Sequence, residues 1–178
     1  MQLYVARHAQ TNYNVEKLCN ADPTVDVHLT DVGIAQAKQL AERLGDVVFS
    51  KIYISELPRT RETASYLKQY ATTPVVVDAR LNDNSTGFES QPIEDYLAAL
   101  AASNDKWHVR LGDGESLADA RQRAEAFLED LKNEPLDTAL VVTHGFIVES
   151  INGILNDMDF ELAATFQITQ GDYLVYDL

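Results

Sequence analysis

The sequence predicts an α/β fold in which helices cover both faces of a mostly parallel sheet. Runs of consecutive apolar residues, such as 3–6 and 139–142, are typical of strands buried on both faces. Between these runs lie segments with apolar residues at helical spacing, such as 31–44. This alternation of strand and helix patterns favours a three-layer α/β/α sandwich with a mostly parallel central sheet.

Each expected element carries its own local signals. Strands are expected near 2–7, 49–54, 75–77 and 138–143, and helices near 31–44, 58–70, 93–103, 116–132 and 146–156. Thr30 can cap the first helix, because its side chain can accept a hydrogen bond from a free N–H of the first turn. Pro58 suits the first turn of the next helix, and Ser116 with Asp119 resembles a capping box.

The last stretch, residues 164–178, is expected to form two short strands around a turn at Gly171-Asp172. No internal repeat, low-complexity tract or linker rich in Pro, Gly or Ser interrupts the chain. A length of 178 residues therefore predicts a single domain over residues 1–178.

The chain is strongly acidic, with a net charge of −14. Such a chain should repel nucleic acid and anionic membranes, so neither is expected as a partner. No apolar run approaches the roughly 20 residues that span a bilayer, and strand-like sequence begins by residue 2 without a basic leader. Cys19 is the only cysteine, which excludes an intrachain disulfide and favours a cytoplasmic location.

Polar residues follow each of the four expected parallel strands. In chain order they are Arg7 and His8, Ser55 and Arg59, Arg80 and Asp83, and His144. Ligands of open α/β sheets bind outside the carboxyl ends of the strands. These side chains are therefore expected to converge on one site.

Two imidazoles and several arginines around one crevice suggest a site for a dianionic phosphate. A guanidinium matches phosphate oxygens two at a time, and histidine can add donors. Backbone N–H groups of the turn after the first strand can complete the cradle. A histidine in such a cradle can also act as a nucleophile that divides hydrolysis into two steps. Departure of an alkoxide then needs a proton, which Asp83 could supply.

Five blocks of the sequence form a recognisable set. The first reads Arg7-His8-Ala9-Gln10-Thr11-Asn12-Tyr13-Asn14, and the others lie at 28–37, 55–64, 114–116 and 141–145. In order and content they resemble the motifs of the histidine phosphatase superfamily, also called phosphoglycerate-mutase-like, whose opening signature is Arg-His-Gly-x-Thr-x-x-Asn. The blocks are specific as a set and cover essentially the whole domain.

The resemblance implies a phosphoglycerate-mutase-like fold and a role for each matched residue. His8 would be the nucleophile that forms a phosphohistidine, and Asp83 the general acid. The phosphate and substrate would be bound by Arg7, Asn14, Asn20, Arg59, His144 and Gly145. The chemistry that the resemblance implies requires no metal and no cofactor.

Three departures from the family pattern bear on this chemistry. Ala9 replaces glycine beside the nucleophile, and Glu56 and Pro58 rearrange the usual Ser-Pro-Leu-x-Arg block. Asp83 stands where the family normally carries glutamate. An aspartic acid is one methylene shorter, and its unperturbed pKa of about 3.9 lies below the value of about 4.3 for glutamic acid. Either the site compensates, or substrates with poor leaving groups turn over weakly.

Other polar residues near the motifs have plainer interpretations. Glu89 is the alternative general acid. His28 and His108 are expected at the surface, and Arg123 on a solvated helix face. The apolar stretch 97–100 is expected either in the core or as a lid against the site.

The sequence therefore predicts a phosphomonoesterase that acts on a small phosphorylated metabolite through a phosphohistidine on His8. One alternative is a phosphoglycerate-type phosphomutase, but mutases of this family are longer and cover the site. The other is a catalytically weak member that only binds a phosphate ligand, for which Ala9 and Asp83 are the support. The composition does not determine an oligomeric state.

Overall fold

A five-stranded sheet forms the centre of the computed structural model, which describes residues 1–178. Its strands are β1 (Gln2–Arg7), β2 (Lys51–Ile54), β3 (Val75–Val77), β4 (Thr138–Thr143) and β5 (Tyr173–Asp177), in the spatial order β3-β2-β4-β1-β5. The first four strands are parallel, and β5 runs antiparallel to β1. The predicted α/β fold with a mostly parallel sheet is confirmed.

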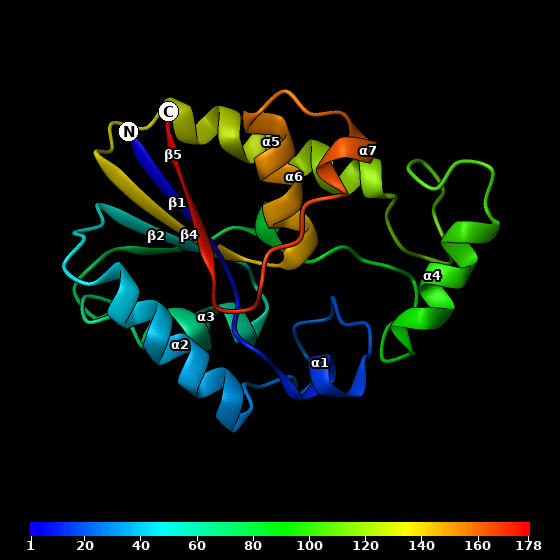
Figure 1. The fold of residues 1–178 in the computed structure, drawn as a ribbon, viewed down its shortest axis with the longest axis horizontal. Coiled ribbons are helices and arrows are strands. Elements are labelled where there is room, and N and C mark those ends of the chain that lie inside the picture. Colours follow the sequence, from blue (N-terminus) through cyan, green and yellow to red (C-terminus); the bar gives the residue numbers. More distant parts are fainter.

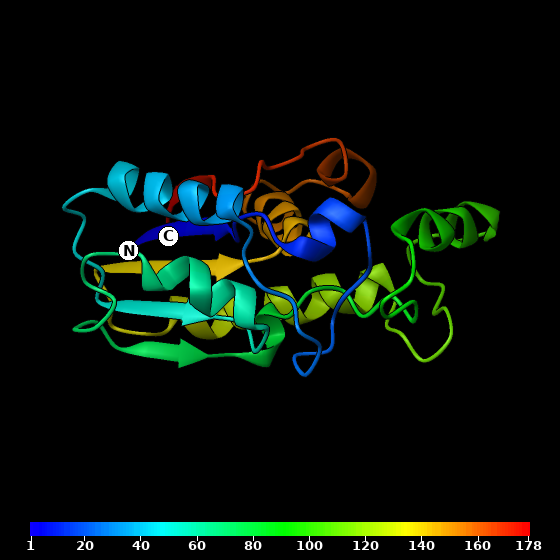
Figure 2. The same ribbon diagram turned by 90° about the horizontal axis from the view of Figure 1, so that it is seen from below.

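Helices cover both faces of the sheet (Figure 1). They are α1 (Asn12–Glu16), α2 (Asp31–Leu44), α3 (Pro58–Ser65), the 3-10 helix η1 (Ala79–Leu81), α4 (Ile93–Ala102), α5 (Leu117–Lys132), α6 (Gly145–Leu155) and α7 (Phe160–Ala163). Helices α2 and α3 lie on one face, and α5 and α6 on the other. Helix α4 stands apart from both layers, beyond the carboxyl ends of the parallel strands (Figure 2). None of the helices has the length and apolar character that crossing a membrane requires.

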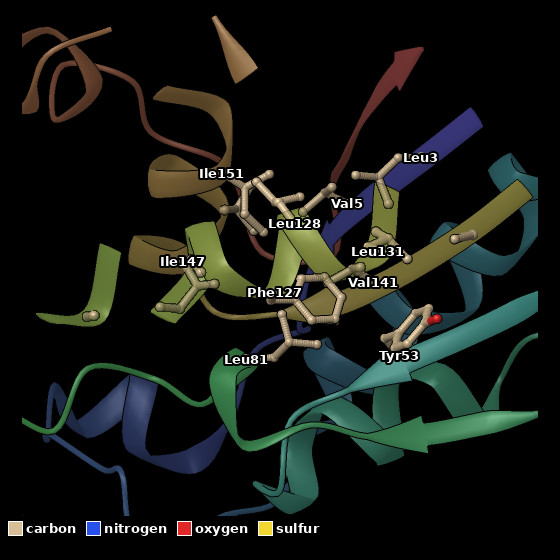
Figure 3. Packing of buried hydrophobic residues seen from close by; sticks show 14 of the residues in the cluster. Leu3, Val5, Tyr53, Leu81, Phe127, Leu128, Leu131, Val141, Ile147 and Ile151 are labelled. Carbon is tan, nitrogen blue, oxygen red and sulfur yellow. The ribbon is translucent and has the colours of Figure 1, made fainter. Parts of the chain in front are cut away.

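Alternate side chains of the strands fill two apolar clusters, one on each face of the sheet. Val141 of β4 packs in the cluster with Phe127 of α5 and Ile151 of α6 (Figure 3). Its neighbours Leu140 and Val142 belong to the cluster on the opposite face. Burial on both faces explains why this strand is a continuous apolar run in the sequence.

The helix expected at 58–70 ends earlier, at Ser65. After it, the chain continues in turns that are closed by hydrogen bonds between residues three apart, such as Tyr70 N to Leu67 O at 3.1 Å. The side chain of Gln69 bonds to the backbone of both Val47 and Phe49 ahead of β2. These tertiary bonds favour turns where local propensity alone favoured helix.

The hairpin expected at 164–178 is wrong, because only β5 is a strand in this region. Gly171, at φ +70°, does form a turn, but its N–H donates to the carbonyl oxygens of Arg7 and His8 at 3.2 and 3.3 Å. The turn therefore delivers β5 to the free edge of β1, where Tyr173 pairs with Ala6.

Gly33, in the first turn of α2, lets this helix approach the loop that follows β1. A Cβ atom at this position would lie 2.0 Å from the carbonyl oxygen of Gln10. The same oxygen accepts a hydrogen bond from Thr30 N at 3.1 Å. Packing here therefore leaves no room for a methyl group and holds the loop after β1 in place.

We predict that Gly33→Ala destabilises the protein by about 1–3 kcal/mol, the usual cost of forcing an extra carbon into a packed site. Without the clash, the same change in a helix would stabilise by about 0.4–1 kcal/mol, because alanine restricts the unfolded chain. Urea denaturation measures the sign directly. Val32→Ala, at a neighbouring exposed position, serves as the control and should change stability by no more than about 0.5 kcal/mol.

Candidate active site

The loops after β1, β2, β3 and β4 meet at one end of the sheet and border a cavity of about 430 Å³. Seven of the eight residues predicted for the site line it, namely Arg7, His8, Asn14, Asn20, Arg59, Asp83 and Gly145. The eighth, His144, is fully buried beside His8, with 5.1 Å between the ring centroids. The structure thus brings all eight positions together.

His8 lies directly after β1 and is almost fully buried. Its Nδ1 is 2.7 Å from the carbonyl oxygen of Ala9, a contact that requires a proton on Nδ1. The lone pair is then on Nε2, which accepts a hydrogen bond from Arg59 Nε at 3.2 Å. Burial, reinforced by the charge of Arg59, holds the pKa of His8 well below its usual value. The imidazole is therefore neutral near pH 7, with its basic nitrogen at the cavity.

Arg59 enters the site from the first turn of α3 and is 3% exposed. Its Nη1 donates to Asn20 Oδ1 at 2.6 Å, and its Nη2 donates to Asp83 Oδ2 at 3.0 Å and to Asn20 O at 3.1 Å. With Nε on His8, every nitrogen of this buried guanidinium has a partner. The cation thus joins three loops around the cavity.

His144 precedes α6 and has one nitrogen with a partner and one without. Its Nε2 is 2.9 Å from Ser55 Oγ, whereas its buried Nδ1 makes no hydrogen bond and lies 3.6 Å from Asp83 Oδ2. Burial and the neighbouring charge of Arg59 hold the pKa of His144 well below its usual value. If Ser55 donates its hydroxyl proton to Nε2, the neutral ring carries its own proton on Nδ1, as an unused donor beside the cavity.

Arg7 contributes a second unused donor. Its Nη1 donates to the carbonyl oxygen of Ile168 at 2.7 Å, but its buried Nε has no partner. Gly145, at the start of α6, allows this guanidinium to approach, because a Cβ there would lie 3.2 Å from Arg7 Cζ. Since buried polar groups are normally paired, Arg7 Nε and His144 Nδ1 indicate where an anionic ligand would bind.

Two asparagines also border the cavity. Asn14 Oδ1 accepts from Thr11 N at 3.0 Å and so caps α1, while its amide nitrogen has no partner in the protein. Asn20 Nδ2 donates to Glu89 Oε1 at 2.8 Å, and Ala21 N donates to Glu89 Oε2 at 2.7 Å. Glu89, the alternative general acid, therefore holds the Asn20 loop with both of its oxygens.

The backbone of Asp83 is held by Arg123, which corrects the expectation that Arg123 lies on a solvated face. Its Nη2 donates to Asp83 O at 3.0 Å, and its Nη1 to Arg80 O at 2.7 Å. Glu115 pairs with the same guanidinium at 2.7 Å. Arg123 lies on the side of α5 that faces the loop after β3, and its long side chain spans the distance from the helix to the backbone of Asp83.

Three other basic residues lie away from the cavity. Arg80 was expected at the site, but it pairs with Asp78 at 2.7 Å and with Asp130 at 2.6 Å. The histidines His28 and His108 are exposed, as expected. No group of three or more His, Cys, Asp or Glu side chains in the structure could hold a metal ion.

Ala9 causes no visible crowding next to the nucleophile. Its methyl group is fully buried and packs with Leu29 and Ala37 in a small cluster. Its N–H donates to Thr63 Oγ1 at 3.1 Å. The substitution of glycine by alanine is therefore accommodated by apolar packing.

Glu149 is a cavity residue that the sequence reasoning missed. It lies on α6 four residues after Gly145, on the same helix face, and lines the cavity without a hydrogen-bond or ion-pair partner. Burial raises its pKa to about 7, against the opposing charge of Arg7. The i, i+4 spacing from a motif residue is the signal that could have identified it.

Known proteins resemble this chain over most of its length. The family model of the histidine phosphatase superfamily (branch 1) matches residues 3–178. "Probable phosphoglycerate mutase GpmB" of Escherichia coli O1:K1 / APEC is 29% identical over 169 residues, which cover 86% of this chain and 76% of the relative. The solved alpha-ribazole phosphatase of Shigella flexneri is 29% identical, with a TM-score of 0.88, and the match covers 100% of this chain and 91% of that one. A mycobacterial glucosyl-3-phosphoglycerate phosphatase, 24% identical with a TM-score of 0.80 over 98% and 90% of the two chains, shares the fold.

We predict that stability falls as the pH is lowered from about 6.5 to about 5.5, by up to about 1.4 kcal/mol per pH unit. In this window the unfolded chain gains protons at His8 and His144, which stay neutral in the fold. Glu149 works in the opposite direction, because it is protonated in the fold and ionised in the unfolded chain. When both histidines of the unfolded chain are protonated, the unfolded state therefore binds one proton more than the folded state, because it gains two at His8 and His144 and lacks the one on Glu149.

Urea denaturation at several pH values measures this slope, and two variants separate the contributions. Glu149→Gln should steepen the loss to up to about 2.7 kcal/mol per pH unit, and His144→Asn should nearly abolish it. Equal slopes in all three proteins would contradict the assigned protonation states.

Proposed function

The chain belongs to the histidine phosphatase superfamily (branch 1), and from this premise we propose that it hydrolyses the phosphate monoester of a small metabolite through a phosphohistidine on His8. The observation that carries the proposal is the neutral imidazole of His8, whose Nε2 lone pair lies at the cavity among cationic and unpaired donors. Relatives named as phosphatases support the same reaction class.

In the proposed first step, His8 Nε2 gives up the hydrogen bond from Arg59 Nε and attacks phosphorus, the N–P bond forms and the P–O bond to the alcohol breaks. Arg59, Arg7 Nε and His144 Nδ1 would bind the phosphoryl oxygens. Such preorganised donors are usually the largest single contribution to catalysis. Asn14 Nδ2 and the first N–H groups of α6 at Gly145 would add neutral donors.

Asp83 would serve as general acid and then as general base. Its carboxyl group borders the cavity and is partly exposed, 3.0 Å from Arg59 and 3.6 Å from His144. In the first step it would give a proton to the departing oxygen. In the second step Asp83 would take a proton from the water that attacks the phosphohistidine, which restores His8.

The two alternatives make different demands on the same site. A phosphomutase, the activity in the name of the E. coli relative, must keep the phosphoryl group from water and return it to the substrate. Activity on phosphoglycerate only with added bisphosphoglycerate would favour it. A binding member would hold phosphate without forming a phosphohistidine.

The setting of the activity is also part of the proposal. The pairing of β1 with both β4 and β5 supports one domain over residues 1–178. A small phosphorylated metabolite is the proposed partner. A cytoplasmic location stays a prediction from the single cysteine.

We predict that His8→Ala abolishes hydrolysis of both p-nitrophenyl phosphate and an alkyl phosphate, because no nucleophile remains. Asp83→Asn should spare the aryl ester, whose leaving group needs no proton, and slow the alkyl ester by about 10²–10⁴-fold, the usual contribution of general acid catalysis. The initial rate of phosphate release at low substrate (kcat/KM) measures both, because it reports the first step alone and is not affected by the loss of Asp83 as the base of the second step. His28→Ala, at an exposed histidine outside the cavity, is the control. Equal losses for both esters in Asp83→Asn would contradict its role as the acid.

We also predict a covalent intermediate. Brief mixing with ³²P-labelled p-nitrophenyl phosphate followed by a denaturing quench should leave label on the protein that acid releases and base does not. The label should be absent from His8→Ala. A labelled residue other than His8 would refute the proposed nucleophile, and tight phosphate binding without label would favour the binding alternative.

A further inference from the structure

The cavity holds one charged group that the proposed reaction does not use, the carboxyl group of Glu149. It projects from α6 one turn beyond Gly145, and neither a hydrogen bond nor an ion pair holds it. Burial raises its pKa to about 7, and the negative charge of Asp83 acts in the same direction. An unpaired, partly buried carboxyl group is costly, so its place in the cavity calls for a role.

The positive charges of the cavity are already committed to the phosphate. Arg7 and Arg59 are the only basic residues among its lining, apart from the neutral His8. Two acidic residues, Asp83 and Glu149, also line it. A second anionic group on the substrate would therefore find no free cation and would meet one or two carboxylates.

One wall of the cavity is apolar. Helix α4 faces the cavity with Ile93, Leu97 and Leu100, and Trp107 and Phe146 also line it. Ile93 and Leu97 are 42% and 54% exposed, so ligand binding could still remove apolar surface from water there. Helix α4 lies beyond the carboxyl ends of the strands (Figure 2), and its side chains line the same cavity as His8, so the alcohol part of an ester bound at His8 can extend along this wall.

From this arrangement we infer that the site selects phosphomonoesters whose alcohol part is apolar and carries no second negative charge, with Glu149 as the residue that rejects carboxylate-bearing substrates such as phosphoglycerate. Leu97 and its neighbours on α4 bind the apolar part. The inference rests on the proposed function, since it concerns the same phosphate cradle. It adds the substrate class.

Binding of phosphonates tests the inference without requiring turnover. Butylphosphonate and 3-phosphonopropanoate have similar size, and only the second carries a carboxylate. At pH 8, where Glu149 is charged, calorimetry should give a Kd for butylphosphonate at least about tenfold lower than for 3-phosphonopropanoate, the order expected for a like charge at a half-buried site.

Two variants assign the preference to residues. In Glu149→Gln the ratio of the two Kd values should shrink to about threefold or less, because one like charge is gone. The control Glu129→Gln removes an equal charge from an exposed position of α5 and should leave the ratio unchanged. Leu97→Ser should weaken butylphosphonate by about fivefold, roughly the contribution of one or two buried methylenes. Leu162→Ser, at an equally exposed leucine outside the cavity, should have no effect.

Three results would overturn the inference. They are equal binding of the two phosphonates by the wild type, an unchanged ratio in Glu149→Gln, and binding of neither phosphonate while inorganic phosphate binds. Because these readouts do not depend on catalysis, a protein that fails to hydrolyse any ester would refute the proposed function separately.

Discussion

The buried guanidinium of Arg59 is the interaction on which the rest of the site depends. It bonds to His8 after β1, to Asn20 in the following loop and to Asp83 after β3, while its own backbone belongs to α3. A buried cation is tolerated only when its donors are paired, and removal of one partner typically costs about 3–5 kcal/mol. The same hydrogen bonds therefore stabilise the fold around this cation and set the distances between the reacting groups.

Electrostatics gives the two imidazoles a common state. Burial and the charge of Arg59 keep both His8 and His144 neutral. The ring of His8 carries its lone pair on Nε2, and with Ser55 as the donor to His144 Nε2 the other ring presents an unused N–H; these are the two functions that phosphoryl transfer needs at one centre. A protein with a net charge of −14 thus contains a small region suited to an anion, formed by Arg7 and Arg59. The protein as a whole is acidic, whereas the two cationic side chains of the cavity are those of Arg7 and Arg59.

Much of this arrangement could be predicted from the sequence, since the polar residues follow apolar strands and parallel strands end at one edge. The residues that were misplaced are those whose position depends on tertiary contacts. Arg123 reads as a solvated helix residue, and only the packing of α5 against η1 shows that it reaches the backbone of Asp83. Glu149 was not singled out from the sequence, although it lies one helical turn after Gly145. The turn at Gly171 could be predicted from the sequence. The sequence does not show that the strand after this turn, β5, pairs with β1.

The strands that pair with β1 have a consequence for how the protein folds during synthesis. Its first strand pairs with β4, more than 130 residues later in the chain, and with β5 at the far end, and Gly171 bonds to the carbonyl oxygens that flank His8. During synthesis the segment that carries His8 therefore emerges well before β4 and β5, and its native neighbours in the sheet do not exist until these strands follow. Contacts of such long sequence separation slow folding, because the chain loses the entropy of loop closure before these stabilising contacts form. An apolar strand without partners is also exposed to aggregation in the meantime, and His8 directly follows the strand that waits longest for its partners.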